Sequence, residues 1–100
     1  MKVLEHSPQQ WFLFEHKGKL LLDARCSHSF IDYSLMIELN EQELALYQCG
    51  GSEYLSKLAY EIHYSAPIVA GSTSAYRGRD LSKYYSELSD AAVKKWREST

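Results

Sequence analysis

The most constraining feature of the sequence is an alternation of apolar and polar side chains in the segment HSFIDYSLMIEL. Odd-numbered positions from Ile31 to Leu39 are apolar or aromatic, whereas the even-numbered positions include Asp32 and Glu38. Side chains of a strand point alternately to its two faces, so this period of two predicts a β-strand at about 29–39. We expect the odd-numbered face to be buried, because a slip of one residue would bring Glu38 into the core.

A β-hairpin is predicted before this strand. Two apolar runs, WFLF and LLL, are separated by EHKGK, in which Gly18 can adopt the positive φ of a tight turn. We therefore expect strands at about 10–15 and 19–25. Both runs are apolar at consecutive positions, which predicts that both faces of the hairpin are at least partly covered.

Two helices are predicted directly after the strands. Asn40, followed three positions later by Glu43, is typical of a capping box and predicts a helix at about 41–48. The sequence CGGS should end this helix, with Gly50 as a left-handed C-terminal cap. A second helix is expected at about 53–64. Its predicted buried stripe consists of Leu55, Leu58, Ala59 and Ile62.

A last helix is predicted at about 80–97, with Asp80 as its N-cap and basic residues near its negative end. Ser89 is a second possible cap, so one helix or two remain open. The preceding residues 66–79 are rich in glycine and hydroxyl side chains and are predicted as a long loop, which a short strand at 68–70 could interrupt. Long loops in compact domains are disproportionately functional.

Strands followed by helices predict an α+β fold, in which a three-stranded antiparallel meander is packed by two or three helices. One hundred residues are enough for a single domain with one core, so we expect one domain over 1–100. The longest apolar run has four residues, far below the roughly 20 needed to span a bilayer, and the polar residues that follow Val3 and Leu4 lead us to expect no secretory signal. We expect cytoplasmic residence, with Cys26 and Cys49 as reduced thiols.

The strongest candidate binding site is the end of the predicted loop. Two arginines and several hydroxyl groups there suit a phosphate or a carboxylate. The residues concerned are Ser72, Thr73, Ser74, Tyr76, Arg77 and Arg79. No glycine-rich phosphate motif is matched. The alternative is a solvated loop in which Arg77 or Arg79 pairs with an acidic residue of the first half. Replacing both arginines with alanine is expected to leave folding intact.

The sequence offers no complete catalytic or metal site. Cys26, His28 and Asp32 are ligand types, but the Cys-x-His pair supplies only two close ligands, and no second pair lies at the spacing of a structural zinc site. No strained nucleophile turn of the G-x-S-x-G kind is present. We therefore expect no metal and no cofactor, and the question of an enzyme stays open, leaning towards none.

The favoured function is a small soluble binding or regulatory module that acts by protein–protein interaction. Eight tyrosines support it, because tyrosine is enriched at interfaces. The candidate surfaces are the loop and the exposed strand edges.

The alternative is a nucleic-acid-binding accessory domain that uses Arg77, Arg79, Lys83, Lys94, Lys95 and Arg97. Against it, residues 1–65 carry five basic and nine acidic side chains, and the whole chain has a net charge of −2. The third class is an enzyme with an unrecognised site. The partner and the oligomeric state stay open.

Overall fold

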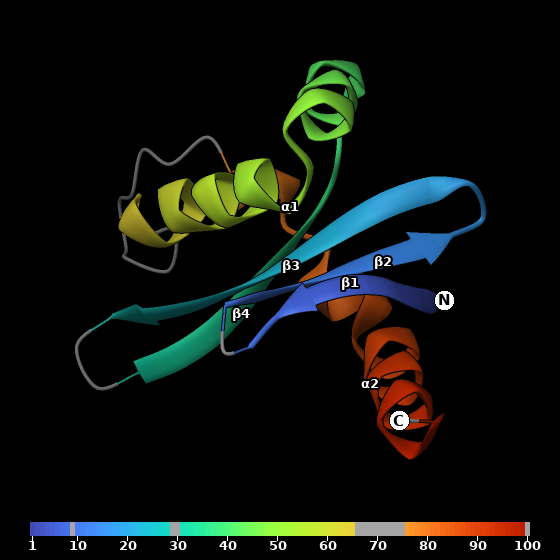
Figure 1. Cartoon of the computed structure of the whole chain (residues 1–100). Helices are drawn as coiled ribbons and strands as arrows, with labels where there is room; N and C mark the ends of the chain where they lie inside the picture. Colours follow the sequence, from blue (N-terminus) through green and yellow to red (C-terminus); the bar gives the residue numbers. More distant parts are fainter. Residues whose placement is uncertain (9, 29–30, 66–75, 100) are drawn as a thin grey trace.

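The computed structural model describes residues 1–8, 10–28, 31–65 and 76–99 of the chain. It contains a four-stranded antiparallel sheet with helices on both faces (Figure 1). The elements in chain order are β1 (Lys2–Ser7), β2 (Trp11–His16), β3 (Lys19–His28), β4 (Ile31–Glu38), α1 (Glu41–Tyr64), the short 3₁₀ helix η1 (Arg77–Arg79) and α2 (Ser82–Ser99). The predicted α+β class, with strands first and helices after, is confirmed.

The sheet is a meander with the strand order β1-β2-β3-β4. β2, β3 and β4 correspond to the three predicted strands, although residues 29–30 of the third prediction lie outside the described residues. The prediction of only three strands is wrong, because β1 forms a fourth. Its only apolar residues are the adjacent Val3 and Leu4, so no run or alternation marks it in the sequence.

The turn between β2 and β3 has positive φ at both of its central residues. Lys17 has a φ of 52° and Gly18 a φ of 80°, while the flanking His16 and Lys19 pair with each other. Positive φ at both positions is what a two-residue type I′ hairpin requires. The predicted role of Gly18 is thus confirmed.

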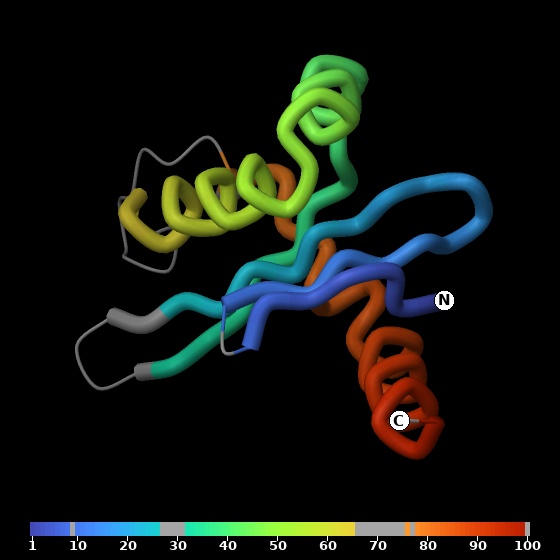
Figure 2. The backbone as a smooth tube through the Cα atoms, viewed as in Figure 1, coloured from blue at the N-terminus to red at the C-terminus, as the bar shows by residue number. Residues whose placement is uncertain are grey.

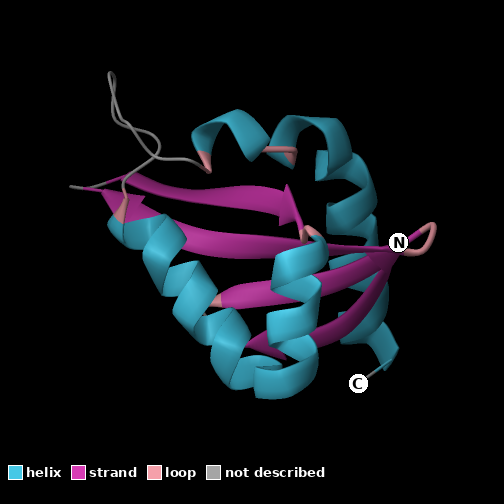
Figure 3. Cartoon of the chain, turned by 90° about the horizontal axis from the view of Figure 1, so that it is seen from above, coloured by secondary structure: helices cyan, strands magenta, loops and turns pink. Residues whose placement is uncertain are grey.

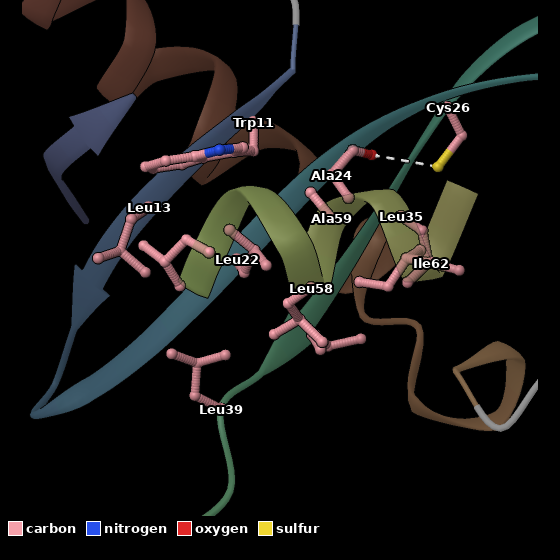
Figure 4. Packing of buried hydrophobic residues seen from close by; sticks show 12 residues of the cluster. Trp11, Leu13, Leu22, Ala24, Cys26, Leu35, Leu39, Leu58, Ala59 and Ile62 are labelled. Carbon is pink, nitrogen blue, oxygen red and sulfur yellow. Dashed lines mark hydrogen bonds between the residues drawn. The ribbon is translucent and has the colours of Figure 1, made fainter. Parts of the chain in front are cut away.

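Both faces of the sheet are buried, and two core layers result. The α1 layer contains Trp11, Leu13, Leu22, Ala24, Leu35, Ile37, Leu39, Leu55, Leu58, Ala59 and Ile62 (Figure 4). The α2 layer contains Phe12, Phe14, Leu21, Met36 and Ala92, with Trp96 and Tyr85 packed against them. Figures 1 and 3 show α1 and α2 on opposite faces of the sheet. The prediction that both faces of the hairpin are covered is confirmed.

The prediction that the odd-numbered face of β4 is the buried one is correct only in part, because the structure buries a residue of the other face as well. Leu35, Ile37 and Leu39 are buried, as the odd-numbered pattern predicts. Met36 belongs to the opposite face, yet only 2% of its surface is exposed, because α2 packs on that face. The alternation therefore locates the α1 layer but not the α2 layer.

The helix α1 contains one non-helical residue, Gly51, with φ 61° and ψ −144°. This break separates the two helices predicted at 41–48 and 53–64, and Figure 2 shows the two parts of α1 set at an angle to each other. The prediction that Gly50 supplies the positive φ is wrong, since Gly51 does so. The backbone at Gly51 is close to a region that essentially only glycine adopts, so the break depends on this residue.

The two parts of α1 carry the predicted local features. The N–H of Glu43 donates to the Asn40 side-chain oxygen at 2.8 Å, and the N–H of Asn40 donates to the Glu43 carboxylate at 2.9 Å. This is the predicted capping box. In the second part, the indole N–H of Trp11 donates to the Ser56 hydroxyl at 3.0 Å, which ties the helix to β2. The predicted stripe is buried at Leu55, Leu58, Ala59 and Ile62.

The helix α2 begins at Ser82, two residues later than predicted. Asp80 is not its N-cap, because the N–H of Tyr85 donates to the carbonyl oxygen of Leu81 at 3.1 Å, which makes Leu81 the cap. The Asp80 carboxylate instead accepts the N–H of Ser82 at 2.9 Å, so it still satisfies a donor at the helix start. The helix runs through Ser89 without interruption, which makes it one helix.

The chain between η1 and α2 covers part of the outer edge of β4. The N–H of Leu81 donates to the carbonyl oxygen of Met36 at 2.7 Å, and the N–H of Met36 donates to the Ser82 hydroxyl at 2.9 Å. The Arg79 guanidinium donates to the carbonyl oxygen of Glu38 at 2.8 Å. These bonds occupy groups of an edge that was predicted to be open, so this part of β4 is closed to strand addition.

Replacing Gly51 with alanine is expected to lower the free energy of unfolding by about 1–3 kcal/mol, because alanine rarely adopts its φ and ψ. An added Cβ meets nothing within 4 Å, so the cost comes from backbone strain. Gly78→Ala is the matched control, since Gly78 lies outside the positive-φ region and its added Cβ also meets nothing within 4 Å. Urea unfolding followed by circular dichroism measures both, and equal stability of the two variants would contradict the expectation.

Candidate functional site

Arg79, one of the predicted binding residues, forms a bidentate ion pair with Glu43 at the start of α1. Its Nη1 donates to Oε2 at 3.0 Å and its Nη2 donates to Oε1 at 2.6 Å. The exposed fraction is 10% for the Glu43 side chain and 32% for that of Arg79. Burial raises the pKa of Glu43, but hydrogen bonds from Arg79 and from the Asn40 backbone more than offset this, so the pKa is lowered. Arg79 therefore connects η1 to α1. This pairing agrees with the alternative expectation that Arg77 or Arg79 pairs with an acidic residue of the first half of the chain.

Of the other predicted binding residues, the structure describes the Tyr76 side chain and the backbone of Arg77. Tyr76 packs against the α1 layer and its hydroxyl donates to the Glu61 carboxylate at 3.4 Å. Arg77 is the first residue of η1. The three hydroxyl residues at 72–74 lie outside the described residues. An anion site in this loop stays a prediction, in which Arg79 would take part as a side chain already paired with Glu43.

A large groove opens at the end of the sheet where β3 and β4 extend beyond β2, and we call it the end groove. Its volume is about 1270 Å³. Its lining comes from both faces of the sheet. On the α1 face it includes Cys26, Tyr33, Ser56, Ala59, Tyr60 and His63. On the α2 face it includes Phe12, Asp23, Arg25, Asp32, Ser34, Ser89, Asp90, Val93, Lys94 and Arg97.

Asp23 is a partly buried carboxylate on the α2 side of the end groove. Burial raises the pKa of Asp23 to about 6, although the charge of Arg25 and a hydrogen bond with Ser34 act in the opposite direction. The charge of Asp90 raises the pKa as well. A second cavity of about 370 Å³ shares Asp23 and Asp90 with the groove and continues along the start of α2. Asp23 therefore changes its charge near pH 6 at a position that lines the groove.

The charges that line the end groove are of both signs. Its carboxylates belong to Asp23, Asp32, Asp90 and Glu98. Its basic side chains belong to Arg25, Lys94 and Arg97. A phosphate backbone would meet four carboxylates here, which opposes the binding of a polyanion. A polypeptide segment carries charges of both signs and suits this lining better.

Exposed tyrosines stand at the α1 side of the end groove. Tyr60 lines the groove and is 63% exposed, and its ring stacks on that of Tyr64 with 6.1 Å between the ring centroids. Tyr64 is itself 77% exposed. Such rings offer a rigid apolar surface with a polar tip, which is common at protein interfaces. Tyr84 is also largely exposed, but it lies on α2 outside the groove lining.

The structure shows the surroundings of the two cysteines, of which Cys26 is a possible metal ligand in the sequence. Cys26 is buried, its thiol donates to the carbonyl oxygen of Ala24 at 3.7 Å, and burial raises its pKa to about 11. It is therefore a thiol at neutral pH and a poor nucleophile. Cys49 is exposed, and neither cysteine forms a disulfide. Within the described part of the chain, no group of three or more His, Cys, Asp or Glu side chains could hold a metal ion.

Two side chains of the end groove, Asp23 and Arg25, are not predicted from the sequence to line a site. Lys94 and Arg97 are predicted only as phosphate contacts. One signal was present: Asp23 lies inside the apolar run LLLDA, where a charge is unusual unless it is paired or used. The groove itself has no sequence signal, because it depends on how far β3 and β4 extend past β2.

Arg79→Ala is expected to lower the free energy of unfolding by about 2–4 kcal/mol, because Glu43 would remain as a largely buried carboxylate without its partner. The ion pair of Arg79 argues against the expectation that both loop arginines can be replaced without effect on folding. Lys19→Ala is the matched control, since it removes an exposed ion pair with Glu38 at 3.5 Å and should cost less than about 1 kcal/mol. Urea unfolding compares the two variants, and a cost for Arg79→Ala no larger than that of the control would refute this role.

Asp23→Asn is expected to raise the free energy of unfolding at pH 7.5 by about 2–3 kcal/mol. The pKa of Asp23 in the folded state, about 6, lies above its ordinary value of 3.8. The contribution of Asp23 to the free energy of unfolding is therefore fully favourable below pH 3.8 and is lost as the pH rises from there through about 6. The gain in the variant should vanish near the ordinary pKa, which urea unfolding across this pH range tests. Asp32→Asn, at an exposed position, is the control, and a gain independent of pH would reject the assignment.

No protein-family model, curated protein or solved structure matches the chain. The groove and its rim are thus the basis on which a function is proposed.

Proposed function

We propose that this chain is a small protein-binding module that holds a segment of a partner protein in the end groove. The observation that carries the proposal is the size and construction of the groove. Its volume of about 1270 Å³ exceeds the roughly 300–1,000 Å³ of typical small-molecule pockets. Its walls come from three strands and both helices, so a bound segment would contact much of the domain.

The chemistry of the groove supports a protein ligand. Tyr60 extends its wall with a largely exposed ring, while Phe12, Ala59 and Val93 add apolar surface within it. The lining also contains acidic and basic side chains, which gives it the mixed character of a transient protein interface.

The two rival classes find less support in the same groove. For a nucleic acid, the four carboxylates of the lining oppose the phosphates, and binding would have to weaken steeply with added salt. For an enzyme, the groove would have to bring together titratable groups with displaced pKa values. Asp23 and Cys26 both have raised pKa values, but they lie on opposite faces of β3, so they do not face each other.

We also propose that the module works in the cytoplasm. Both cysteines are free thiols, which suits a reducing compartment. None of the helices in the described ranges is long and apolar enough to cross a membrane.

Photo-crosslinking from the rim of the groove tests the proposed function. A photoreactive phenylalanine derivative is introduced in place of Tyr60 in one variant and of Tyr84 in another, and each is irradiated in extracts of the source cell. Both positions are highly exposed tyrosines on helices, but only Tyr60 lines the groove. We expect a protein adduct from position 60 that is absent from position 84, and Lys94→Glu in the same variant should reduce it.

Equal adducts from both positions would argue that the contact is unspecific. A nucleic-acid adduct from position 60 that is lost at moderate salt would favour the rival class.

A further inference from the structure

The end groove surrounds a stretch of β3 that has no described strand on one side. β2 pairs with β3 only as far as Ala24, whereas β3 continues to His28 in its pairing with β4. Beyond that point, the N–H of Arg25 donates to the carbonyl oxygen of Gln10 at 2.8 Å. The N–H of Gln10 turns away and donates to the carbonyl oxygen of Ser7 at 3.0 Å, so it does not complete the pair with Arg25. Only one of the two backbone hydrogen bonds of the Gln10–Arg25 pair therefore forms, and the β2–β3 ladder ends there.

The next backbone groups on this edge belong to Ser27. Alternate residues of a strand direct their N–H and carbonyl groups to the same edge. Because the N–H of Arg25 faces the β2 side, the N–H and carbonyl oxygen of Ser27 face that side too. Among the described strands, none continues β2 along this edge. Within residues 1–8, 10–28, 31–65 and 76–99, no strand pairs with one donor and two acceptors of β3, counting the Arg25 carbonyl oxygen, so these groups are open to another chain.

The groove has room on both sides of this edge. An added strand points alternate side chains to the two faces of a sheet, so it needs space on each. On the α1 face the lining next to the edge includes Ala59 and Tyr60, which are apolar or aromatic. On the α2 face it includes Arg25 and Lys94, which are charged. Because the groove is lined on both faces, both sets of side chains of an added strand could make contacts in it.

We propose that the end groove binds an extended segment of a partner protein, which pairs as an additional strand with the free edge of β3 at Arg25 and Ser27. The segment alternates apolar or aromatic side chains, which face Ala59 and Tyr60, with charged side chains, which face Arg25 and the basic residues of α2. This inference rests on the proposed function and specifies the kind of partner. Main-chain hydrogen bonds would provide affinity, and the two linings would provide selectivity.

The two outer edges of the sheet are less suited to the same role. The edge of β4 is occupied at Met36 and Glu38 by the chain that leads into α2. The edge strand β1 has an irregular register between Val3 and Glu5, and such bulges discourage strand addition. The end of β3 combines an open ladder with a built groove, which neither outer edge does.

Two octapeptides with the same composition test the proposal by nuclear magnetic resonance. One alternates valine and tyrosine with lysine and glutamate, and the other groups the apolar residues in one block. We expect the alternating peptide to bind more tightly, to shift the amide signals of Arg25 and Ser27, and to slow hydrogen exchange of the Ser27 amide. Failure of the alternating peptide to bind at millimolar concentration, or equal binding of both peptides without protection of Ser27, would overturn the proposal.

Ser27→Pro removes the backbone donor at the free edge without removing a hydrogen bond of the sheet, and proline is tolerated at such edge positions. It should weaken binding about tenfold, because one hydrogen bond is lost and an unpaired carbonyl remains on the peptide. Ser27→Ala keeps the N–H and should bind within about twofold of the natural chain. Should Ser27→Pro fail to fold, methylation of alternate backbone nitrogens of the peptide tests the same bonds from the other side. Unchanged binding of both the proline variant and the methylated peptides would rule out strand addition.

Tyr60→Ala separates this inference from the proposed function. Binding that depends on Tyr60 but not on the Ser27 N–H would leave a protein-binding groove without strand pairing. Binding that depends on neither Tyr60 nor the Ser27 N–H would contradict both the proposed function and strand pairing. We expect binding to depend on both groups.

Discussion

The structure depends on one constraint, the burial of four consecutive residues in β2. Trp11, Phe12, Leu13 and Phe14 are all buried, although neighbouring side chains of a strand point to opposite faces. A sheet with such a strand must be covered on both sides. Because all four strands precede the helices, α1 must cover one face and α2 the other. The chain therefore has to pass from one face of the sheet to the other between the two helices.

The passage between the faces explains how the polar contacts are distributed. The chain reaches α2 along the edge of β4, where Leu81 and Ser82 bond to the backbone of Met36. Arg79 joins the same crossing to Glu43 of α1, so the crossing is anchored to both the sheet and the first helix. On the opposite side of the β3–β4 hairpin, β2 pairs with β3 only as far as Ala24, and the end groove forms where no described strand continues it.

The fold could be predicted from the sequence wherever a residue pattern carries the information locally. The runs of β2 and β3, the alternation of β4, and the capping box of Asn40 and Glu43 are such patterns. β1 was not predictable in this way, because it is held by pairing with β2 and by few apolar side chains of its own. Met36 shares the even-numbered face of β4 with Asp32 and Glu38, so the alternation predicts a more exposed position for it. Its burial depends on α2, whose position cannot be predicted from the sequence of β4.

The candidate site was less predictable than the fold. Glu43 was identified as a capping residue, but its pairing with Arg79 joins residues that are 36 positions apart and arises only through tertiary packing. The end groove depends on the unequal lengths of neighbouring strands and on the path of α2. The charge of Asp23 within an apolar run was the one local sign of it.

The two tryptophans of the chain, Trp11 and Trp96, lie in different core layers. Trp11 is 1% exposed and is bonded to Ser56 of α1, whereas Trp96 belongs to α2 and packs edge-on against Phe12 at 5.7 Å between ring centroids. The fluorescence of each indole therefore depends on a different helix. Variants with a single tryptophan would distinguish detachment of α1 from detachment of α2, so the molecule contains a separate optical reporter for each face of its sheet.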